Sequence, residues 1–260
     1  MRKLGCKPAV TRHNQPRLSG LRMMARKAPA RLVRDHIDPA PLMLANDQIG
    51  DCTSVGIANH LRATASLAGY QIDVSTGDAV RFYSESTGYR PANAESDQGG
   101  IEVDVLGIAG RDGYHLDHGT YYPLWGTVDP QDRNALALVV AGMGCAYLGV
   151  QLAAADQAPG VWDTDRTGDN TPGSWGGHCL LLWDYTGLGD NDLVTLLTWG
   201  VRQKATWQWL HSRIMEAHGI IWPQMVLPSG FYPTGPDLDM LKADNAAFLM
   251  GNLWQVPVTS

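Results

Sequence analysis

The hydrophobic pattern of the chain changes from helical to strand-like near its middle, and this change limits the folds that the chain can adopt. In the first half, apolar residues recur at helical spacing in segments that Gly or Asp residues bound. In the second half, apolar runs of strand length are separated by turn sequences such as Pro159-Gly160 and Pro172-Gly173. Helices followed by antiparallel strands predict an α+β fold.

The pattern also predicts where the individual elements lie. The expected helices are 52–67, 80–86, 103–113 and a segment that ends at Ala141 after an N-cap at Asp129 or Asp132, with a loop over 124–130. The expected strands are 145–152, 178–185, 193–199 and 219–226, with a helix over 207–217 between the last two.

The composition is that of a globular protein. Apolar residues make up 44% of the 260 residues and charged residues 18%, so a large core can form and global disorder is excluded. The uncharged stretch 135–155 is interrupted by three glycines, and we interpret it as a buried helix and strand rather than a membrane span. The first ten residues do not resemble a signal peptide, and the four cysteines are unevenly spaced, which together favour a reducing compartment.

The positive charge is concentrated at the N-terminus. Residues 1–34 contain ten Lys or Arg and no Asp or Glu, whereas the rest of the chain has a net charge of −16. This pattern predicts an extended basic arm on an acidic body. The arm has three interpretations: it wraps its own body, it docks on an acidic protein partner, or it contacts nucleic acid. We divide the chain into an arm (1–40), a central domain (41–226) and a C-terminal extension (227–260).

Cys52 is the first candidate for chemistry, because it opens a predicted helix after a glycine turn, in Asn46-Asp47-Gln48-Ile49-Gly50-Asp51-Cys52. The partial positive charge at a helix N-terminus favours the thiolate, which is the nucleophilic form. We therefore expect Cys52 to be alkylated well below pH 8 and faster than the other cysteines. The alternative is that Cys52 is only a small buried apolar residue.

His178 is the second candidate, because it begins an apolar strand after Ser174-Trp175-Gly176-Gly177. An imidazole with an ordinary pKa near 6.5 suits a base that takes and returns a proton. Trp199 ends the next strand in Thr198-Trp199-Gly200, where an indole would shield a polar site from water. The alternatives are a histidine that hydrogen-bonds loop carbonyls and an ordinary core tryptophan.

In this order, the Cys, Gly-His and Trp-Gly motifs resemble those of papain-like cysteine peptidases. The resemblance implies a helical half carrying the nucleophile helix and an antiparallel sheet half carrying the base. It implies that Cys52 is the nucleophile and His178 the base, and that Asn46, six residues before Cys52, supplies the oxyanion-hole amide.

The resemblance leaves the third catalytic residue open. The family carries an Asn where this chain has Leu197, which cannot orient an imidazole, so Thr198 and Asp184 are the candidates for that role. Trp175, Gly177 and Trp199 are expected to line the site. We expect no cofactor and no metal.

A closer resemblance, from Lys3-Leu4-Gly5 to Thr198-Trp199-Gly200, is to a group of bacteriophage and prophage proteins. It implies a phage-associated peptidase or amidase acting on a protein or peptide, located in the virion or in the cytoplasm of the bacterial host. The alternative function is that of a virion structural or assembly protein with little activity, whose arm and tail bind neighbouring subunits. Other virion proteins are the partners expected for residues 1–34, nucleic acid is the less favoured partner, and no membrane contact is expected.

Overall fold

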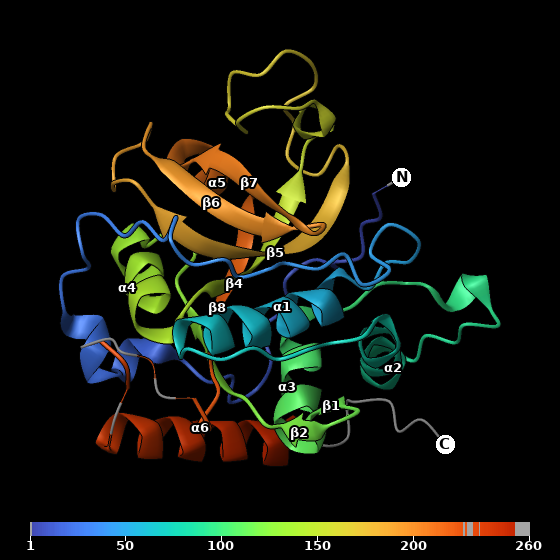
Figure 1. The fold of residues 1–260 in the computed structure, drawn as a ribbon, viewed down its shortest axis with the longest axis vertical. Coiled ribbons are helices and arrows are strands. Elements are labelled where there is room, and N and C mark those ends of the chain that lie inside the picture. The colour runs from blue at the N-terminus through green and yellow to red at the C-terminus, as the bar shows by residue number, and fades with distance from the viewer. Residues whose placement is uncertain (1, 226, 228–230, 234, 253–260) are drawn as a thin grey trace.

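The computed structural model describes residues 2–225, 227, 231–233 and 235–252, and it divides into a helical half and a sheet half (Figure 1). The helices are α1 (Cys52–Leu67), α2 (Thr76–Thr87), α3 (Glu102–Asp112), α4 (Arg133–Met143), α5 (Trp207–Arg213) and α6 (Pro236–Asn252). Short 3₁₀ helices cover Leu18–Gly20, Arg22–Ala25, Ala94–Ser96 and Ala154–Gln157.

The main sheet has six antiparallel strands in the order β3-β8-β4-β5-β6-β7. Its strands are β3 (Leu124–Val128), β4 (Ala146–Leu152), β5 (Gly176–Tyr185), β6 (Leu193–Thr198), β7 (Val201–Thr206) and β8 (Ile214–Ile221). A separate hairpin pairs β1 (Tyr114–Leu116) with β2 (Gly119–Tyr121).

Several predicted elements are confirmed. Helix α1 has the predicted bounds, and α4 begins after Asp132, whose side chain accepts a hydrogen bond from the Ala135 amide. Helix α2 starts four residues earlier than expected, because Ser75 and Asp78 form a reciprocal capping box that extends it. Strands β4, β5 and β6 lie at the predicted positions within two residues.

The edge of the sheet differs from the prediction. The predicted loop 124–130 contains strand β3, which pairs with β8 from Leu124–Ile221 to Val128–Ala217. The predicted helix 207–217 was wrong in its second half, because α5 ends at Arg213 and Ile214 begins β8. The predicted strand 219–226 is the end of that same β8.

The sheet separates two apolar cores. On one side, α1 and α3 bury Cys52, Tyr147, Cys179 and Trp183 against the sheet. On the other side, α4 and α5 cover residues such as Leu148 and Leu180. The stretch 135–155 contributes α4 and β4 to these layers, and no helix among the described residues is long and apolar enough to cross a membrane.

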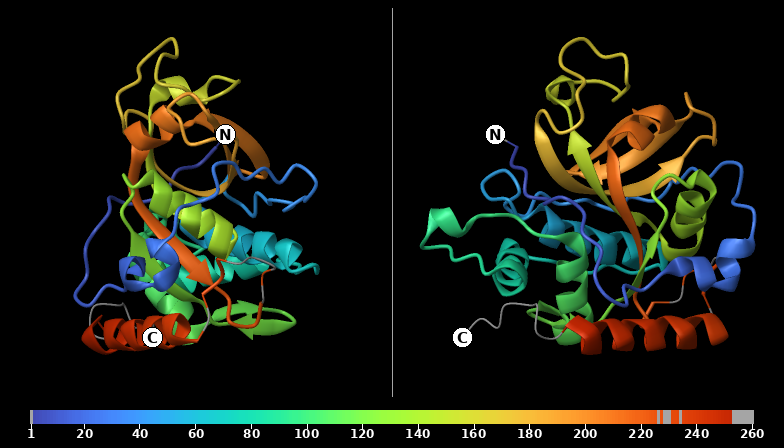
Figure 2. Two further views of the ribbon diagram at one scale, coloured as in Figure 1. Left: turned by 90° about the vertical axis from the view of Figure 1, so that its left-hand side faces the viewer. Right: turned by 180° about the vertical axis from the view of Figure 1, so that it is seen from behind.

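The basic segment lies along the chain's own body (Figures 1 and 2). Leu18, Leu21 and Met23 are buried in the core beside α4. Arg12 forms an ion pair with Asp104 of α3, at 2.7 Å between Nη2 and Oδ2. Arg34 is buried and donates to the backbone carbonyls of α4 and β5. These contacts agree with the first interpretation of the segment, in which it wraps its own body.

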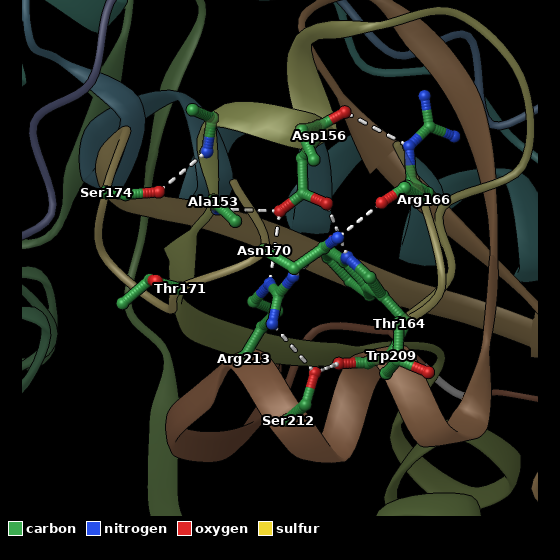
Figure 3. Close-up of polar contacts among 12 residues, drawn as sticks. Ala153, Asp156, Thr164, Arg166, Asn170, Thr171, Ser174, Trp209, Ser212 and Arg213 are labelled. Atoms are coloured by element: carbon green, nitrogen blue, oxygen red, sulfur yellow. Dashed lines mark hydrogen bonds and ion pairs between the residues drawn. The ribbon is translucent and has the colours of Figure 1, made fainter. Parts of the chain in front are cut away.

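A buried ion pair orders the long connection between β4 and β5 (Figure 3). Asp156 accepts hydrogen bonds from the Ala153 amide at 2.7 Å and the Trp209 indole at 2.8 Å, and from Arg213 Nε at 3.2 Å. The side chains of Asp156 and Arg213 are 0% and 2% exposed. The pair fixes the start of the connection that leads to Trp175 and β5.

Replacing Asp156 with Asn should lower the free energy of unfolding by about 3 kcal/mol, because Arg213 would keep its charge in a buried position without a counter-ion. Urea denaturation measures this loss. The matched control is Asp190→Asn. The Asp190 side chain in its ion pair with Arg133 is 73% exposed, so solvent screens the pair and its loss should change stability little. Equal losses in the two variants would contradict the assigned role of burial.

Candidate active site

Cys52 is the first residue of α1 and lies against strand β5. It is 1% exposed. The Tyr147 hydroxyl donates to the Thr53 carbonyl at 2.9 Å and ties the first turn of α1 to the sheet. One turn later, a Cβ on Gly56 would lie 2.7 Å from the Cys179 sulfur, so only glycine allows this approach of helix and strand. The helix therefore presents Cys52 directly beside the start of β5.

His178 lies at the start of β5 and has one ring nitrogen engaged. Its Nε2 is 2.6 Å from the Thr198 hydroxyl, and the Trp199 indole stacks on the imidazole with centroids 3.9 Å apart at 11°. Its Nδ1 is buried and has no hydrogen-bond partner among the described residues. The Thr198 hydroxyl and the Trp199 indole thus fix the orientation of the ring. Nδ1 remains available to exchange a proton with another group.

The Trp199-Gly200 motif forms the turn that places this indole. Both residues have positive φ, 45° and 71°, and they connect β6 to β7 as a two-residue hairpin of the type I′ kind. Such a turn commonly needs glycine, and Trp199 adopts the left-handed conformation despite its side chain. The turn directs the indole back over His178, and Trp175 packs on the indole from outside with centroids 5.4 Å apart.

Of the two candidates for the third residue, the structure places only Thr198 at His178. Asp184 lies on the same strand as His178 but six residues further along, which is roughly 20 Å at the rise of a β-strand. Its carboxylate instead accepts hydrogen bonds from Thr195 and from the Arg34 amide. The prediction for Asp184 was therefore wrong, because spacing along an extended strand separates residues rather than bringing them together.

Asn46 lies in the turn that precedes α1, where Leu44 and Ala45 both have positive φ. It is 1% exposed, and its Nδ2 is 3.4 Å from the Ile49 carbonyl oxygen. The structure places Asn46 on the helical side of the site, and its role in an oxyanion hole remains a prediction.

The first residues of the chain cover the site in an extended conformation. The amides of Gly5 and Cys6 donate to the Gly177 carbonyl at 3.2 Å, and Gly5 accepts from the Gly100 amide at 2.8 Å. The Trp199 indole donates to the Lys3 carbonyl at 3.2 Å. We call residues 2–7 the covering segment. It passes between the helical half and the sheet half, next to the residue that precedes His178 (Figure 2).

Glycines make room for the covering segment on both sides. A Cβ on Gly5 would overlap the Gly50 carbonyl oxygen, and a Cβ on Gly177 would overlap the Cys6 carbonyl oxygen. Pockets remain at both ends, one of about 450 Å³ beside Arg2 and Trp175 and one of about 180 Å³ beside Lys7. The two pockets thus lie beside the first and the last residue of the covering segment.

Burial explains why the thiol is not activated in this structure. Burial raises the pKa of Cys52 to about 12, although the amides of Cys179 and Gly5 oppose the rise. Burial, together with the nearby Arg2 cation, lowers the pKa of His178 to about 3. Both groups are therefore neutral at neutral pH. The expected fast alkylation of Cys52 well below pH 8 does not fit the covered form.

Two features of the site were not anticipated. Asp51 directly precedes Cys52 and is 0% exposed, and burial raises the pKa of its carboxyl to about 8. By hydrogen-bond geometry neither of its carboxylate oxygens has a partner among the described residues, although the Asn46 side chain is near enough to oppose the rise. The other feature is the covering segment, for which the Lys3-Leu4-Gly5 motif was the available signal.

Comparisons with known proteins show which fold the chain has. A scan of protein-family models and a search of curated proteins gave no match. Among solved structures, xylellain, a cysteine protease from Xylella fastidiosa, is similar with a TM-score of 0.61 and 13% identity, over 85% of this chain and 98% of that one. The chain has a papain-like fold.

A second solved structure, the digestive procathepsin L2 of Tenebrio molitor, is similar with a TM-score of 0.52 and 16% identity, over 76% of this chain and 69% of that one. The papain-like α+β prediction is thus confirmed, with Cys52 at the start of a helix on one side and the sheet on the other.

Proposed function

We propose that this protein is a phage-associated cysteine peptidase or amidase in which Cys52 is the nucleophile and His178 the general base. The proposal rests on the positions of the His178 imidazole and the Cys52 thiol, each of which is fixed by its neighbours. Thr198 and Trp199 fix the His178 ring with Nδ1 unpartnered, and α1 presents Cys52 beside the same strand. A base oriented by a third group beside a nucleophile is the arrangement that covalent catalysis requires.

The proposed reaction follows from these positions. The thiol proton moves to His178 Nδ1 as the sulfur bonds to the substrate carbonyl carbon. The oxyanion accepts hydrogen bonds from the Cys52 amide and from the Asn46 side chain. His178 returns the proton to the departing amine, and water then hydrolyses the thioester with His178 again acting as base.

The covering segment supports an extended peptide as the substrate. It binds through main-chain hydrogen bonds to Gly177 on the sheet side and Gly100 on the helical side. An extended substrate can use the same backbone groups, whatever its sequence, and side chains then fit neighbouring pockets. Because segment and substrate use the same groups, the segment must leave before a substrate binds.

The second candidate function is that of a virion structural or assembly protein with little or no activity. The observation that favours it is the covered, neutral site, in which the pKa of Cys52 is about 12. In this proposal the basic segment 1–34 and the C-terminal extension bind neighbouring virion subunits, and nucleic acid is the less favoured partner. Both candidates place the protein in the virion or the host cytoplasm.

Labelling with a peptidyl epoxide that alkylates catalytic thiolates separates the two candidates. The unmodified chain and the Gly5→Ala variant are each incubated with the probe and digested for mass spectrometry. A Cβ on Gly5 would overlap the Gly50 carbonyl oxygen and so should displace the covering segment. We expect one label per chain on Cys52 in the displaced variant, and no label on Cys145, which is 0% exposed. Absence of label from Cys52 in both proteins would refute the peptidase and favour the structural role.

Thr198→Val should lower kcat about tenfold and leave KM nearly unchanged, because the loss of one hydrogen bond frees the His178 ring without touching the substrate. The assay measures peptide hydrolysis with Thr198→Val introduced into the Gly5→Ala protein, whose covering segment is displaced. Thr195→Val is the matched control, since it removes a hydroxyl of the same strand that contacts Asp184 rather than His178. Equal effects of the two substitutions would assign the loss to the strand and not to His178.

A further inference from the structure

Two glutamates and a histidine form a buried cluster next to the candidate active site. Glu102 is the first residue of α3, and Glu216 and His218 lie on β8. One ligand atom from each residue can be chosen so that all three lie within 4.8 Å of one another. The three residues are 0%, 5% and 0% exposed.

No Lys or Arg side chain among the described residues balances the two carboxylates of this cluster. Among the ion pairs of the described residues, none joins Lys or Arg to Glu102 or Glu216. One oxygen on each carboxylate, Glu102 Oε2 and Glu216 Oε1, is buried without a hydrogen-bond partner. Burial of an unpaired carboxylate costs several kcal/mol, so either protons or a bound cation must neutralise the pair.

The spacing of the donor atoms suits a metal ion. His218 Nε2 is 3.1 Å from Glu216 Oε2 and 3.6 Å from Glu102 Oε2. Ligands at about 2.0 Å from a tetrahedral zinc ion are about 3.3 Å apart, so modest carboxylate rotations would bring these atoms to ligand positions. Gly149 on β4 leaves the space for both glutamates, since a Cβ there would lie 3.0 Å from Glu216 Cγ.

The surroundings of His218 also match those of a metal ligand. Its other nitrogen, Nδ1, is 3.2 Å from the Thr127 hydroxyl, which in turn accepts a hydrogen bond from the Gln15 amide at 2.6 Å. A partner on the far nitrogen is how proteins orient metal-binding imidazoles. A further donor lies just outside this cluster: the Cys6 sulfur is 3.7 Å from Glu102 Oε1, whereas His218 faces Glu102 Oε2, so the thiol would have to shift to join the three ligands.

We propose that Glu102, Glu216 and His218 bind one first-row divalent cation of the Zn²⁺ or Mn²⁺ class, with Cys6 as the fourth ligand. Two carboxylates and an imidazole favour such ions over Ca²⁺ or Mg²⁺. Because Cys6 belongs to the covering segment, the ion fastens that segment to α3 and β8. The proposal does not depend on catalysis by Cys52, and it differs from the expectation that the chain needs no metal.

Zinc titration of EDTA-treated full-length protein by calorimetry tests the site. We expect one equivalent to bind, and Glu216→Gln or His218→Gln to weaken the affinity by at least about 100-fold. The control is His36→Gln, because His36 and Asp35 are 3.8 Å apart but exposed. Absence of stoichiometric binding by the unmodified protein, or unchanged affinity in both variants, would overturn the proposal.

Cobalt substitution keeps the test decisive if a variant fails to fold. Co²⁺ bound by the unmodified protein should give visible bands of a four-coordinate site and a near-ultraviolet band from the Cys6 thiolate. Cys6→Ser should remove only the thiolate band. If the visible bands form but the thiolate band is absent from the unmodified protein, Cys6 is not a ligand and the fastening of the segment is refuted.

Discussion

Replacing Gly5 with alanine is expected to raise the alkylation rate of Cys52 near neutral pH by about 10³-fold. A Cβ on Gly5 would overlap the backbone oxygen of Gly50, which cannot move aside as a flexible side chain could, so the covering segment must leave. Its departure should reduce the burial that raises the pKa of Cys52 to about 12, and the pKa should then fall toward the ordinary value of 9.0 even though the opposing Gly5 amide is lost as well. A fall of three units raises the thiolate fraction about 10³-fold, and the thiolate is the reactive form.

Iodoacetamide labelling followed by mass spectrometry measures this rate at each cysteine. The matched control is Gly119→Ala, because a Cβ on Gly119 meets no atom within 4 Å. Cys145 is an internal control, since it is buried beneath Arg34 and away from the segment. An unchanged rate at Cys52 in a folded Gly5→Ala protein would mean that the covering segment does not control access to the thiol.

The nucleophile helix and the central strands could be predicted because their signals are local. Helix α1 carries its apolar residues at helical spacing, and β4 to β6 are apolar runs bounded by turns. The edge of the sheet could not be predicted in this way. Strand β3 is five residues long and includes Gly126, and it is stabilised by pairing with β8 more than 80 residues later. Propensity over 207–217 was likewise overridden after Arg213 by pairing with β3 and β4.

The residues of the candidate site could be predicted from sequence motifs, but its covering by residues 2–7 could not. Cys52, His178 and Thr198 were found because each lies at or near the end of an element, where side chains from different strands and helices meet. The covered form depends instead on backbone approaches between residues far apart in the chain, such as Gly5 with Gly50 and Gly177 with Cys6. A glycine in the sequence does not indicate which distant residue will pack against it. The cluster of Glu102, Glu216 and His218 was hidden for the same reason, since Glu102 lies more than 100 residues before the other two.

Replacing His178 with glutamine in the Gly5→Ala background is expected to reduce kcat/KM for a peptide substrate by about 10⁴-fold. Glutamine retains a polar side chain that can contact Thr198, but it cannot take a proton from the Cys52 thiol, and general-base catalysis contributes up to about this factor. Release of the covering segment should lessen the burial of His178 and also remove the Arg2 cation, so the pKa of His178 should rise from about 3 toward its ordinary 6.5. Hydrolysis by the Gly5→Ala protein should therefore change near that pH, and the change should be absent without His178. His36→Gln is the control, because the His36 side chain is 72% exposed. Activity that stays within about tenfold of the parent in the His178 variant would show that another group supplies the base, and the assignment of His178 would fail.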